Sequence, residues 1–496
     1  MLGSYLREDH SPILATDLYE LTMAKGYWKN EMAEREAAFD MFFRRAPFDG
    51  AYAVMAGLET LAGMLSQFHF TSSDLAYLAG LKDRAGQPSF EERFLRYLQD
   101  LRFTCDVSVA PEGTVVFPFE PLVRVQGPML QAQLLETLLL NTLNFQTLIA
   151  TKAARVCLSA QGEPVIEFGL RRAQGLDGGL SAARAAYVGG CAGTSNVLAG
   201  KLLGVPVYGT HAHSWVMAFE SELEAFEAYA RSFPDDTLLL VDTYGTLKGV
   251  ENAIAVGRKL KENGHKLVGL RLDSGDLAYF SIQARRMLDE AGFPDAAILA
   301  SNELDEYVIR SLKDQGARIN MWGVGTKLVT GFDEPALSGV YKLSALREAG
   351  TGEWRGKLKL SEQRVKISIP GLHQVYRYED GDGKFAADAI MDWTEDPKDV
   401  THIVDPNDAT KTKRLSRYVR SEALLTRVFE RGRLVATLPS LEQIRQRTQD
   451  QLARLDDSHK RLENPHIYPV GLSPRLHGIR ESMIKEERAL VRGNGN

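Results

Sequence analysis

The sequence predicts an α/β fold built around a parallel β/α barrel. Short, nearly continuous apolar segments recur along the middle of the chain, with helical patterns between most of them, at residues 164–170, 205–210, 237–244, 266–276, 296–304 and 317–326. Strands of this kind, alternating with helices, are typical of a parallel sheet covered by helices. Six strands, with residues 339–346 as a candidate seventh, favour a barrel, and an open doubly wound sheet remains the alternative.

The length predicts more than one domain. At 496 residues the chain is well beyond the roughly 250–300 residues at which a single hydrophobic core stops growing. We expect an N-terminal α/β domain over residues 1–128 and the barrel as a catalytic domain over 129–346. Residues 347–496 are expected to form a C-terminal domain or to pack back on the N-terminal one.

Elements outside the barrel follow from local patterns. Apolar spacing predicts helices over residues 18–28 and 91–101, and one long or two shorter helices over 129–160. Strand patterns occupy residues 37–45 and 114–128, the second interrupted by prolines. A glycine-containing hairpin or linker is expected over 348–362, and a hairpin followed by a helix over 427–455.

Composition excludes several classes of protein. Lys and Arg number 59 against 65 Asp and Glu, a formal charge of −6, so general binding to nucleic acid or to an anionic membrane is not expected. The three cysteines, Cys105, Cys157 and Cys191, form no CxxC pair, which excludes a disulfide framework and a cysteine-rich zinc site. Residues 1–10 are charged where a signal peptide is apolar, and we expect a cytoplasmic protein.

Polar residues follow each apolar segment of the predicted barrel. In a parallel barrel the carboxyl ends of all strands open on one face, where active sites are built, so these side chains are expected to converge. They are Gly169, Arg171 and Arg172; Gly209, Thr210, His211 and His213; Asp242, Thr243 and Tyr244; Arg271, Asp273, Ser274, Gly275 and Asp276; Asn302 and Glu303; and Gly323, Gly325 and Thr326.

The residue types favour a phosphorylated, anionic ligand. The glycine-rich turn at residues 323–327 can bring backbone N–H groups close to a phosphate, although such a turn is also common without one. The two carboxylates of residues 273–276 can accept from a ribose diol or hold Mg²⁺. Asp276 has an alternative role as the N-cap of a helix that begins near Leu277.

Eight motifs together resemble the nicotinate phosphoribosyltransferase family. They are TDLYELTMAKGYW (16–28), EFGLRRAQGLDGG (167–179), GTHAHSWVMAF (209–219), DTYGT (242–246), LRLDSGDL (270–277), SNELDE (301–306), GVGTKLVT (323–330) and HKRLENPHIYPVGLSPRL (459–476). They lie in order along almost the whole chain. The resemblance implies the type II phosphoribosyltransferase fold, an irregular β/α barrel with an additional α/β N-terminal domain and a C-terminal segment.

The resemblance also implies the reaction. Members of this family transfer the 5-phosphoribosyl group of phosphoribosyl pyrophosphate (PRPP) to nicotinate, giving nicotinate mononucleotide and pyrophosphate, the first step of NAD salvage from nicotinic acid. ATP hydrolysis is coupled to the transfer through a phosphohistidine, Mg²⁺ is the expected metal, and the enzyme class is an ATP-dependent ligase. A homodimer with active sites near the subunit interface is expected, without nucleic-acid or membrane partners.

Site residues follow from the resemblance position by position. His213 matches the second histidine of a G-T-x-x-H pattern and is the implied phosphohistidine, whereas His211 falls on a variable position. Tyr19, Thr210, Arg271, Arg171 and Ser195 are implied for nicotinate. The implied PRPP and phosphate residues are Asp273, Ser274, Gly275, Asp276, Asn302, Gly323, Gly325 and Thr326, with Asp273 and Asp276 also as metal ligands.

Relatives that act on nicotinamide carry an Asp in a G-T-D motif, where this chain has Ser195 within GTSNVLAG (193–200). A serine removes the charge that would repel a carboxylate, which favours nicotinate. The alternatives are a nicotinamide or quinolinate phosphoribosyltransferase, a non-catalytic relative that binds a partner, and an unrelated barrel enzyme acting on a sugar phosphate. The THAHS sequence argues against the quinolinate enzyme, which has no ATP-linked histidine chemistry.

Overall fold

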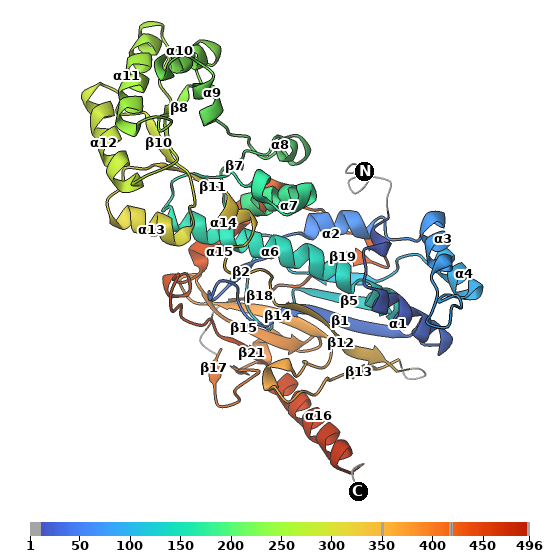
Figure 1. Cartoon of the computed structure of the whole chain (residues 1–496). Coiled ribbons are helices and arrows are strands. Elements are labelled where there is room, and N and C mark those ends of the chain that lie inside the picture. The colour runs from blue at the N-terminus through green and yellow to red at the C-terminus, as the bar shows by residue number, and fades with distance from the viewer. Residues whose placement is uncertain (1–10, 349–351, 416–417, 419, 494–496) are drawn as a thin grey trace. The chain divides into compact units, whose positions relative to one another are not determined.

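The computed structural model describes residues 11–348, 352–415, 418 and 420–493 (Figure 1). The expectations for residues 1–10, and for 349–351 of the predicted hairpin or linker, lie outside the described residues. The chain divides into two compact units: unit 1 combines residues up to Leu148 with those from Ala336 onward, and unit 2 is Ile149–Pro335. The boundaries expected after residues 128 and 346 both fall inside unit 1.

Unit 1 contains a seven-stranded antiparallel sheet with the strand order β13-β12-β1-β5-β3-β19-β20. The apolar strand predicted over residues 37–45 is β1, which is buried almost throughout. The strands are β1 (Glu36–Phe43), β3 (Asp106–Val109), β5 (Val123–Pro128), β12 (Gly339–Arg347), β13 (Trp354–Gly356), β19 (Thr426–Glu430) and β20 (Arg433–Leu434).

The assignment of residues 339–346 as a seventh barrel strand is wrong. The segment does form a strand, β12, but it pairs antiparallel with β1 of unit 1, from Gly339 opposite Phe43 to Leu346 opposite Ala37. Its apolar pattern indicates a strand without specifying the partner, because pairing is decided by the faces that two strands bury together.

A second sheet of unit 1 has the strand order β17-β16-β21-β15-β14-β18. Its pairs are antiparallel except for β15 with β21. The strands are β14 (His373–Glu379), β15 (Phe385–Asp392), β16 (His402–Val404), β17 (Thr412–Arg414), β18 (Arg420–Ala423) and β21 (Val470–Leu472). A small sheet pairs β2 (Ala53–Val54) with β4 (Val115–Val116).

The helices predicted in the outer segments are confirmed. The long apolar stretch is broken at Leu135 into α5 and α6, and α6 continues across the unit boundary. α15 begins with a capping box in which Ser440 and Gln443 satisfy each other's backbone N–H groups. The helices are α1 (Leu18–Lys29), α2 (Leu58–Leu65), α3 (Ser72–Gly80), α4 (Glu92–Asp100), α5 (Met129–Leu134), α6 (Glu136–Ser159), α15 (Leu441–Arg454) and α16 (Pro474–Gly493).

Unit 2 is built on a parallel sheet with the strand order β7-β6-β11-β10-β9-β8. The first strand, β6, lies beside the last, β11, which is the order of a barrel rather than of a doubly wound sheet. The strands are β6 (Val165–Glu167), β7 (Gly193–Thr194), β8 (Leu238–Leu240), β9 (Gly269–Leu272), β10 (Ala297–Ala300) and β11 (Met321–Val324). The strand expected over 205–210 is reduced to one parallel bridge between Val207 and Thr194.

Helices alternate with these strands, as the sequence predicts (Figure 1). Buried side chains of strands and helices form one core in unit 2, with Trp322 of β11 fully buried in it. The helices are α7 (Gly175–Val188), α8 (Val197–Leu203), α9 (His213–Met217), α10 (Glu222–Ser232), α11 (Thr246–Glu262), α12 (Leu277–Glu290), α13 (Glu306–Asp314) and α14 (Thr326–Val329). No helix in the described part of the chain is both long and apolar enough to span a membrane.

Candidate active site at the carboxyl ends of the unit 2 strands

The parallel strands of unit 2 place most of the predicted site residues at the carboxyl ends of the strands. Arg171 follows β6 in a short 3₁₀ helix, and Ser195 follows β7 directly. Arg271 lies in β9, with residues 273–276 just after that strand, and Asn302 follows β10. The glycine-rich turn connects β11 to α14, which begins at Thr326. Strand ends therefore collect these groups as the sequence predicts.

Arg271 is the centre of the densest group of contacts. Its Nη1 donates to the Thr210 hydroxyl at 3.2 Å, and its Nη2 lies 3.0 Å from Asp273 Oδ1. Its Nε donates to the Ser301 hydroxyl at 2.8 Å. The guanidinium carbon of Arg271 lies over the ring of Phe168, 5.6 Å from the ring centre. The guanidinium is therefore fixed in orientation by neighbours on three sides.

Asp273 is held ionised beside Arg271. The Ser301 hydroxyl donates to Asp273 Oδ1 at 2.5 Å, in addition to the contact from Arg271. Burial alone would raise the pKa of Asp273, but the hydrogen bond from Ser301 and the positive charge of Arg271 outweigh it, so the pKa is lowered from its ordinary value. The site thus contains a fixed negative charge next to a fixed positive one.

His213 begins α9 and faces the same carboxylate. Its Nδ1 lies 3.1 Å from the Thr243 hydroxyl, and its Nε2 lies 3.7 Å from Asp273 Oδ2. The His213 side chain is 41% exposed, so a donor from solution can reach the imidazole. The Thr243 contact fixes one ring nitrogen and leaves the other toward the site.

Asp242, noted in the sequence only as a strand-end residue, holds the two residues that follow β9. Its Oδ2 accepts from the backbone N–H of Asp273 at 3.0 Å and from the Ser274 hydroxyl at 2.5 Å. Its Oδ1 is buried and has no hydrogen-bond partner among the residues that the structure describes. A buried carboxylate oxygen of this kind is rare in proteins, and it is an acceptor available to a bound cation or hydrogen-bond donor.

Two predicted residues have unusual backbone conformations. Asn302 has φ +102°, which non-glycine residues rarely adopt and which is found at functional sites where the surroundings hold the strain. Gly275 has φ +78°, and a Cβ there would lie 2.7 Å from the ring of Phe280.

Asp276 accepts from the backbone N–H of Tyr279 and is the N-cap of α12, the alternative role considered for it.

The glycine-rich turn is shaped by Phe168. A Cβ on Gly323 would lie 2.6 Å from the Phe168 ring, and one on Gly325 would lie 3.1 Å from the Phe168 carbonyl oxygen. Lys327, in the first turn of α14, forms an ion pair of 2.5 Å with Asp305, the N-cap residue of α13. The turn is therefore fixed both by close packing and by charge.

Glu167 and Ser301 are site residues that the sequence interpretation did not single out. Glu167 is buried in β6 and accepts from the Thr194 hydroxyl at 2.5 Å and from the Gly169 N–H. Its carbonyl oxygen accepts from the N–H of Ser195, which orients the segment after β7. Burial raises the pKa of Glu167, and the hydrogen bonds from Thr194 and Gly169 to its carboxylate oppose the rise. Glu167 is the last residue of β6 and Ser301 directly follows β10, and that position was their only signal.

Tyr19 belongs to unit 1, whereas the residues above belong to unit 2. It lies on α1 and is 47% exposed. Partial burial, followed by the negative charges of Glu136 and Glu20, raises its pKa to about 12, so the phenol stays neutral.

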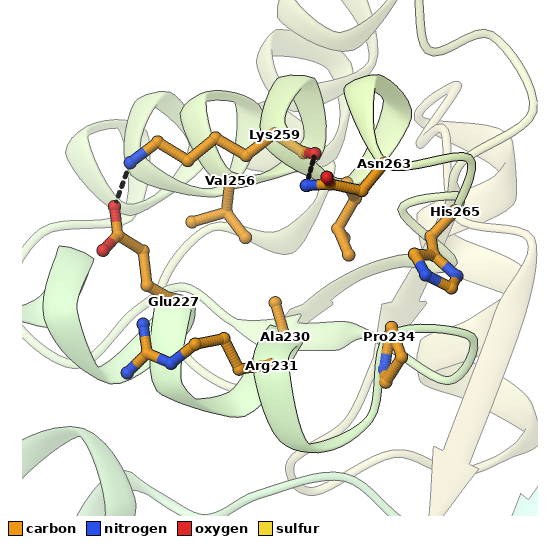
Figure 2. A pocket seen from close by; sticks show the side chains of 9 residues that line it. Glu227, Ala230, Arg231, Pro234, Val256, Lys259, Asn263 and His265 are labelled. Carbon is orange, nitrogen blue, oxygen red and sulfur yellow. Dashed lines mark hydrogen bonds and ion pairs between the residues drawn. The ribbon is translucent and has the colours of Figure 1, made fainter.

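A surface pocket of unit 2 lies away from these residues (Figure 2). It has a volume of about 640 Å³ and is lined by residues of α10 and α11, including Glu227 and Lys259, which form an ion pair, and by His265. None of the predicted site residues lines it.

Comparisons with protein families cover most of the chain. Residues 14–144 match the model of the nicotinate phosphoribosyltransferase (NAPRTase) N-terminal domain. Residues 164–352 match the NAPRTase family, and residues 372–480 match the NAPRTase C-terminal domain.

Individual relatives agree. The chain is 44% identical to nicotinate phosphoribosyltransferase of Bacillus subtilis, over 97% of this chain and 98% of that protein. It is 38% identical to the Dictyostelium discoideum protein of the same name, over 93% and 86%. The crystal structure of human nicotinic acid phosphoribosyltransferase is similar with a TM-score of 0.81 and 34% identity, over 94% and 99%. Nicotinate-nucleotide pyrophosphorylase of Pyrococcus furiosus, at 21% identity and a TM-score of 0.69 over 92% and 99%, is similar in fold.

Proposed function

This chain belongs to the nicotinate phosphoribosyltransferase family, and from that premise we propose that it transfers the phosphoribosyl group of PRPP to nicotinate in a reaction coupled to ATP hydrolysis. Phosphoribosyl transfer to nicotinate, in NAD biosynthesis, follows from family membership. We propose in addition the ATP dependence, the metal and the roles of individual residues.

We assign the nicotinate carboxylate to Arg271. Its guanidinium is already oriented by Thr210, Asp273 and Ser301, so little conformational freedom is lost when an anion binds. Arginine suits a carboxylate because its planar fork can donate two parallel hydrogen bonds. Ser195 and Arg171 are proposed at the same ligand, and Tyr19 is proposed to stack on the pyridine ring.

The transfer itself needs positioning and charge stabilisation rather than a general base. The pyridine nitrogen attacks the anomeric carbon of PRPP with its lone pair and has no proton to lose, while the bond to pyrophosphate breaks. The product ring is a pyridinium, which an aromatic neighbour such as Tyr19 stabilises by about 0.5–2 kcal/mol. The PRPP oxygens are assigned to residues at three strand ends: Asp273, Ser274, Gly275, Asp276, Asn302, Gly323, Gly325 and Thr326.

The carboxylates fit a Mg²⁺ that arrives with PRPP. Within the described residues no group of three or more His, Cys, Asp or Glu side chains is placed to hold a metal ion. Mg²⁺ is commonly bound by only one or two carboxylates together with substrate phosphates and waters, which suits Asp273 and Asp276. Asp242, whose buried Oδ1 has no hydrogen-bond partner among the described residues, contacts the backbone of Asp273 and adds a further carboxylate beside it. Bound there, Mg²⁺ would neutralise charge on the leaving pyrophosphate.

His213 is the proposed acceptor of the ATP γ-phosphoryl group. When its Nδ1–H donates to Thr243, the lone pair of Nε2 faces the site and can attack phosphorus. The new N–P bond forms as the bond from phosphorus to the departing ADP oxygen breaks. Hydrolysis of the phosphohistidine returns inorganic phosphate and the neutral imidazole.

The observation that carries this proposal is the continuous set of contacts from Thr210 through Arg271 and Asp273 to His213. With radiolabelled ATP, the wild-type protein should gain an acid-labile phosphate, and His213→Ala should not. His265→Ala is the matched control, because that histidine lies in the outer pocket shown in Figure 2 and should leave labelling unchanged. Equal labelling of the wild type and His213→Ala would refute the assignment.

Apolar side chains exposed near the site support the proposed homodimer. α8 and the segment after it expose Val197, Leu198, Leu202, Val207 and Tyr208, each more than 40%. Clustered exposure of this kind is typical of protein–protein interfaces. Val197 lies two residues after Ser195, so a partner subunit bound at α8 would lie beside the proposed site.

A further inference from the structure

The parallel sheet of unit 2 has one open seam between its two outermost strands. The strand order ends at β7 on one side and at β8 on the other, and Val207 extends the β7 side by its single bridge. In the described part of the chain, no backbone ladder joins the segment around Val207 to β8. A closed barrel would have such a ladder at this seam.

The side chain of His211 crosses this seam. Its Nε2 accepts a hydrogen bond of 3.2 Å from the backbone N–H of Leu240, on β8. Leu240 is 1% exposed, and the neighbouring N–H of Val241 points the other way, to the carbonyl oxygen of Arg271 on β9. The imidazole therefore occupies the place where a neighbouring strand would offer its carbonyl oxygen.

The environment of His211 suits an uncharged acceptor. The ring is 7% exposed and packs against Tyr229, with ring centres 4.9 Å apart, and Phe226, with ring centres 6.0 Å apart. Its Nδ1 lies 3.4 Å from the Ala212 carbonyl oxygen, which fits a proton on Nδ1 and a lone pair on Nε2. Burial, assisted by the positive charge of Arg271, lowers the pKa of His211 to about 4.

We propose that His211 is a positioning residue that closes the barrel seam by accepting the N–H of Leu240 and thereby fixes the loop that presents Thr210 and His213. Thr210 precedes His211 and donates its hydroxyl to the His211 carbonyl oxygen at 3.2 Å, while it accepts from Arg271. His213 follows two residues later and begins α9. One anchored side chain thus sets the backbone that carries both groups.

The part of this inference that concerns His213 depends on the proposed phosphohistidine, whereas the seam itself does not. The test therefore uses two readouts. Hydrogen exchange of the Leu240 amide, measured by mass spectrometry on a peptide that covers β8, reports the seam directly. Labelling of His213 by radiolabelled ATP reports the position of the loop.

Two variants separate the acceptor from the bulk of the ring. His211→Gln keeps an acceptor, the side-chain oxygen, at about the same reach as Nε2, and His211→Leu fills similar space without one. We expect His211→Leu to lose protection at Leu240 and to label His213 about 10- to 100-fold more slowly, because small misplacements of reacting groups have effects of this size. His211→Gln should restore both properties toward the wild type.

Protection at Leu240 that is unchanged in His211→Leu would overturn the proposal, as would a His211→Gln variant as impaired as His211→Leu. If His211→Leu does not fold, His211→Asn takes its place, since its shorter side chain is polar but does not reach Leu240. If the wild type itself carries no label, the phosphohistidine fails, and the exchange of Leu240 with the kcat and KM for nicotinate still decides the role of His211.

Discussion

Ser301 shows how much a single buried hydroxyl does at this site. It accepts from Arg271 and donates to Asp273, so it fixes the two opposite charges relative to each other. Ser301→Ala should raise the KM for nicotinate about tenfold, the effect of losing a hydrogen bond to a charged group, with a smaller change in kcat. Steady-state kinetics with varied nicotinate measure this. Ser281→Ala, which removes another buried serine hydroxyl of unit 2, is the control. An equal KM for nicotinate in the two variants would contradict the role given to Ser301.

His211 also makes a pH-dependent contribution to stability. Its pKa is about 4 in the folded protein and near 6.5 in an unfolded chain, so the folded state excludes a proton that the unfolded state binds. The contribution of His211 to the free energy of unfolding is at its full value above pH 6.5. It falls by about 3 kcal/mol as the pH decreases toward 4. Denaturant unfolding between pH 7 and 4.5 should show a larger decrease in the free energy of unfolding for the wild type than for His211→Gln. Parallel pH curves would contradict this.

At the scale of elements, the segment from β7 to α8 sets the environment of Ser195. The backbone of Ser195 is held by the Glu167 carbonyl oxygen, and Asn196 caps α8, so a new side chain at position 195 inherits a fixed direction. Ser195→Asp should lower the preference for nicotinate over nicotinamide about tenfold or more, because two like charges repel strongly when partly buried. Competition between the two bases measures the ratio. An unchanged ratio would remove Ser195 from the base-binding site.

The elements that sequence could predict are those with a strong local pattern. α1, α4 and β1 appear as expected because their apolar spacing is regular, and so do five of the six barrel segments as strands. The seventh segment was a strand with the wrong partner, since β12 pairs with β1. β7 was not predicted because two residues carry no periodicity. Among site residues, Ser301 and Glu167 were missed because a polar side chain that ends a buried strand reveals its partners only when neighbouring strands are in place.

For the whole molecule, the proposed homodimer gives a direct test. Val197→Lys combined with Leu202→Lys places two charges among the exposed apolar residues of α8, where both residues are more than half exposed. The double variant should sediment with the mass of one chain, since charges are disfavoured at the centre of interfaces. Leu434→Lys, at an exposed leucine on β20 of unit 1, should leave the mass unchanged. A double variant that keeps the wild-type mass would show that α8 lies outside the interface.

The division of unit 1 along the chain has a consequence for biosynthesis. β1 is made early, but the strand that pairs with it on one side, β12, begins only at Gly339, after all of unit 2 has been translated. Unit 2 is therefore complete on the ribosome while the seven-stranded sheet of unit 1 still lacks β12, β13, β19 and β20, and an unpaired apolar strand is prone to aggregate. Until β12 emerges, one side of β1 has no partner strand, so we expect slower translation to expose β1 for longer and to increase chaperone binding to the nascent chain.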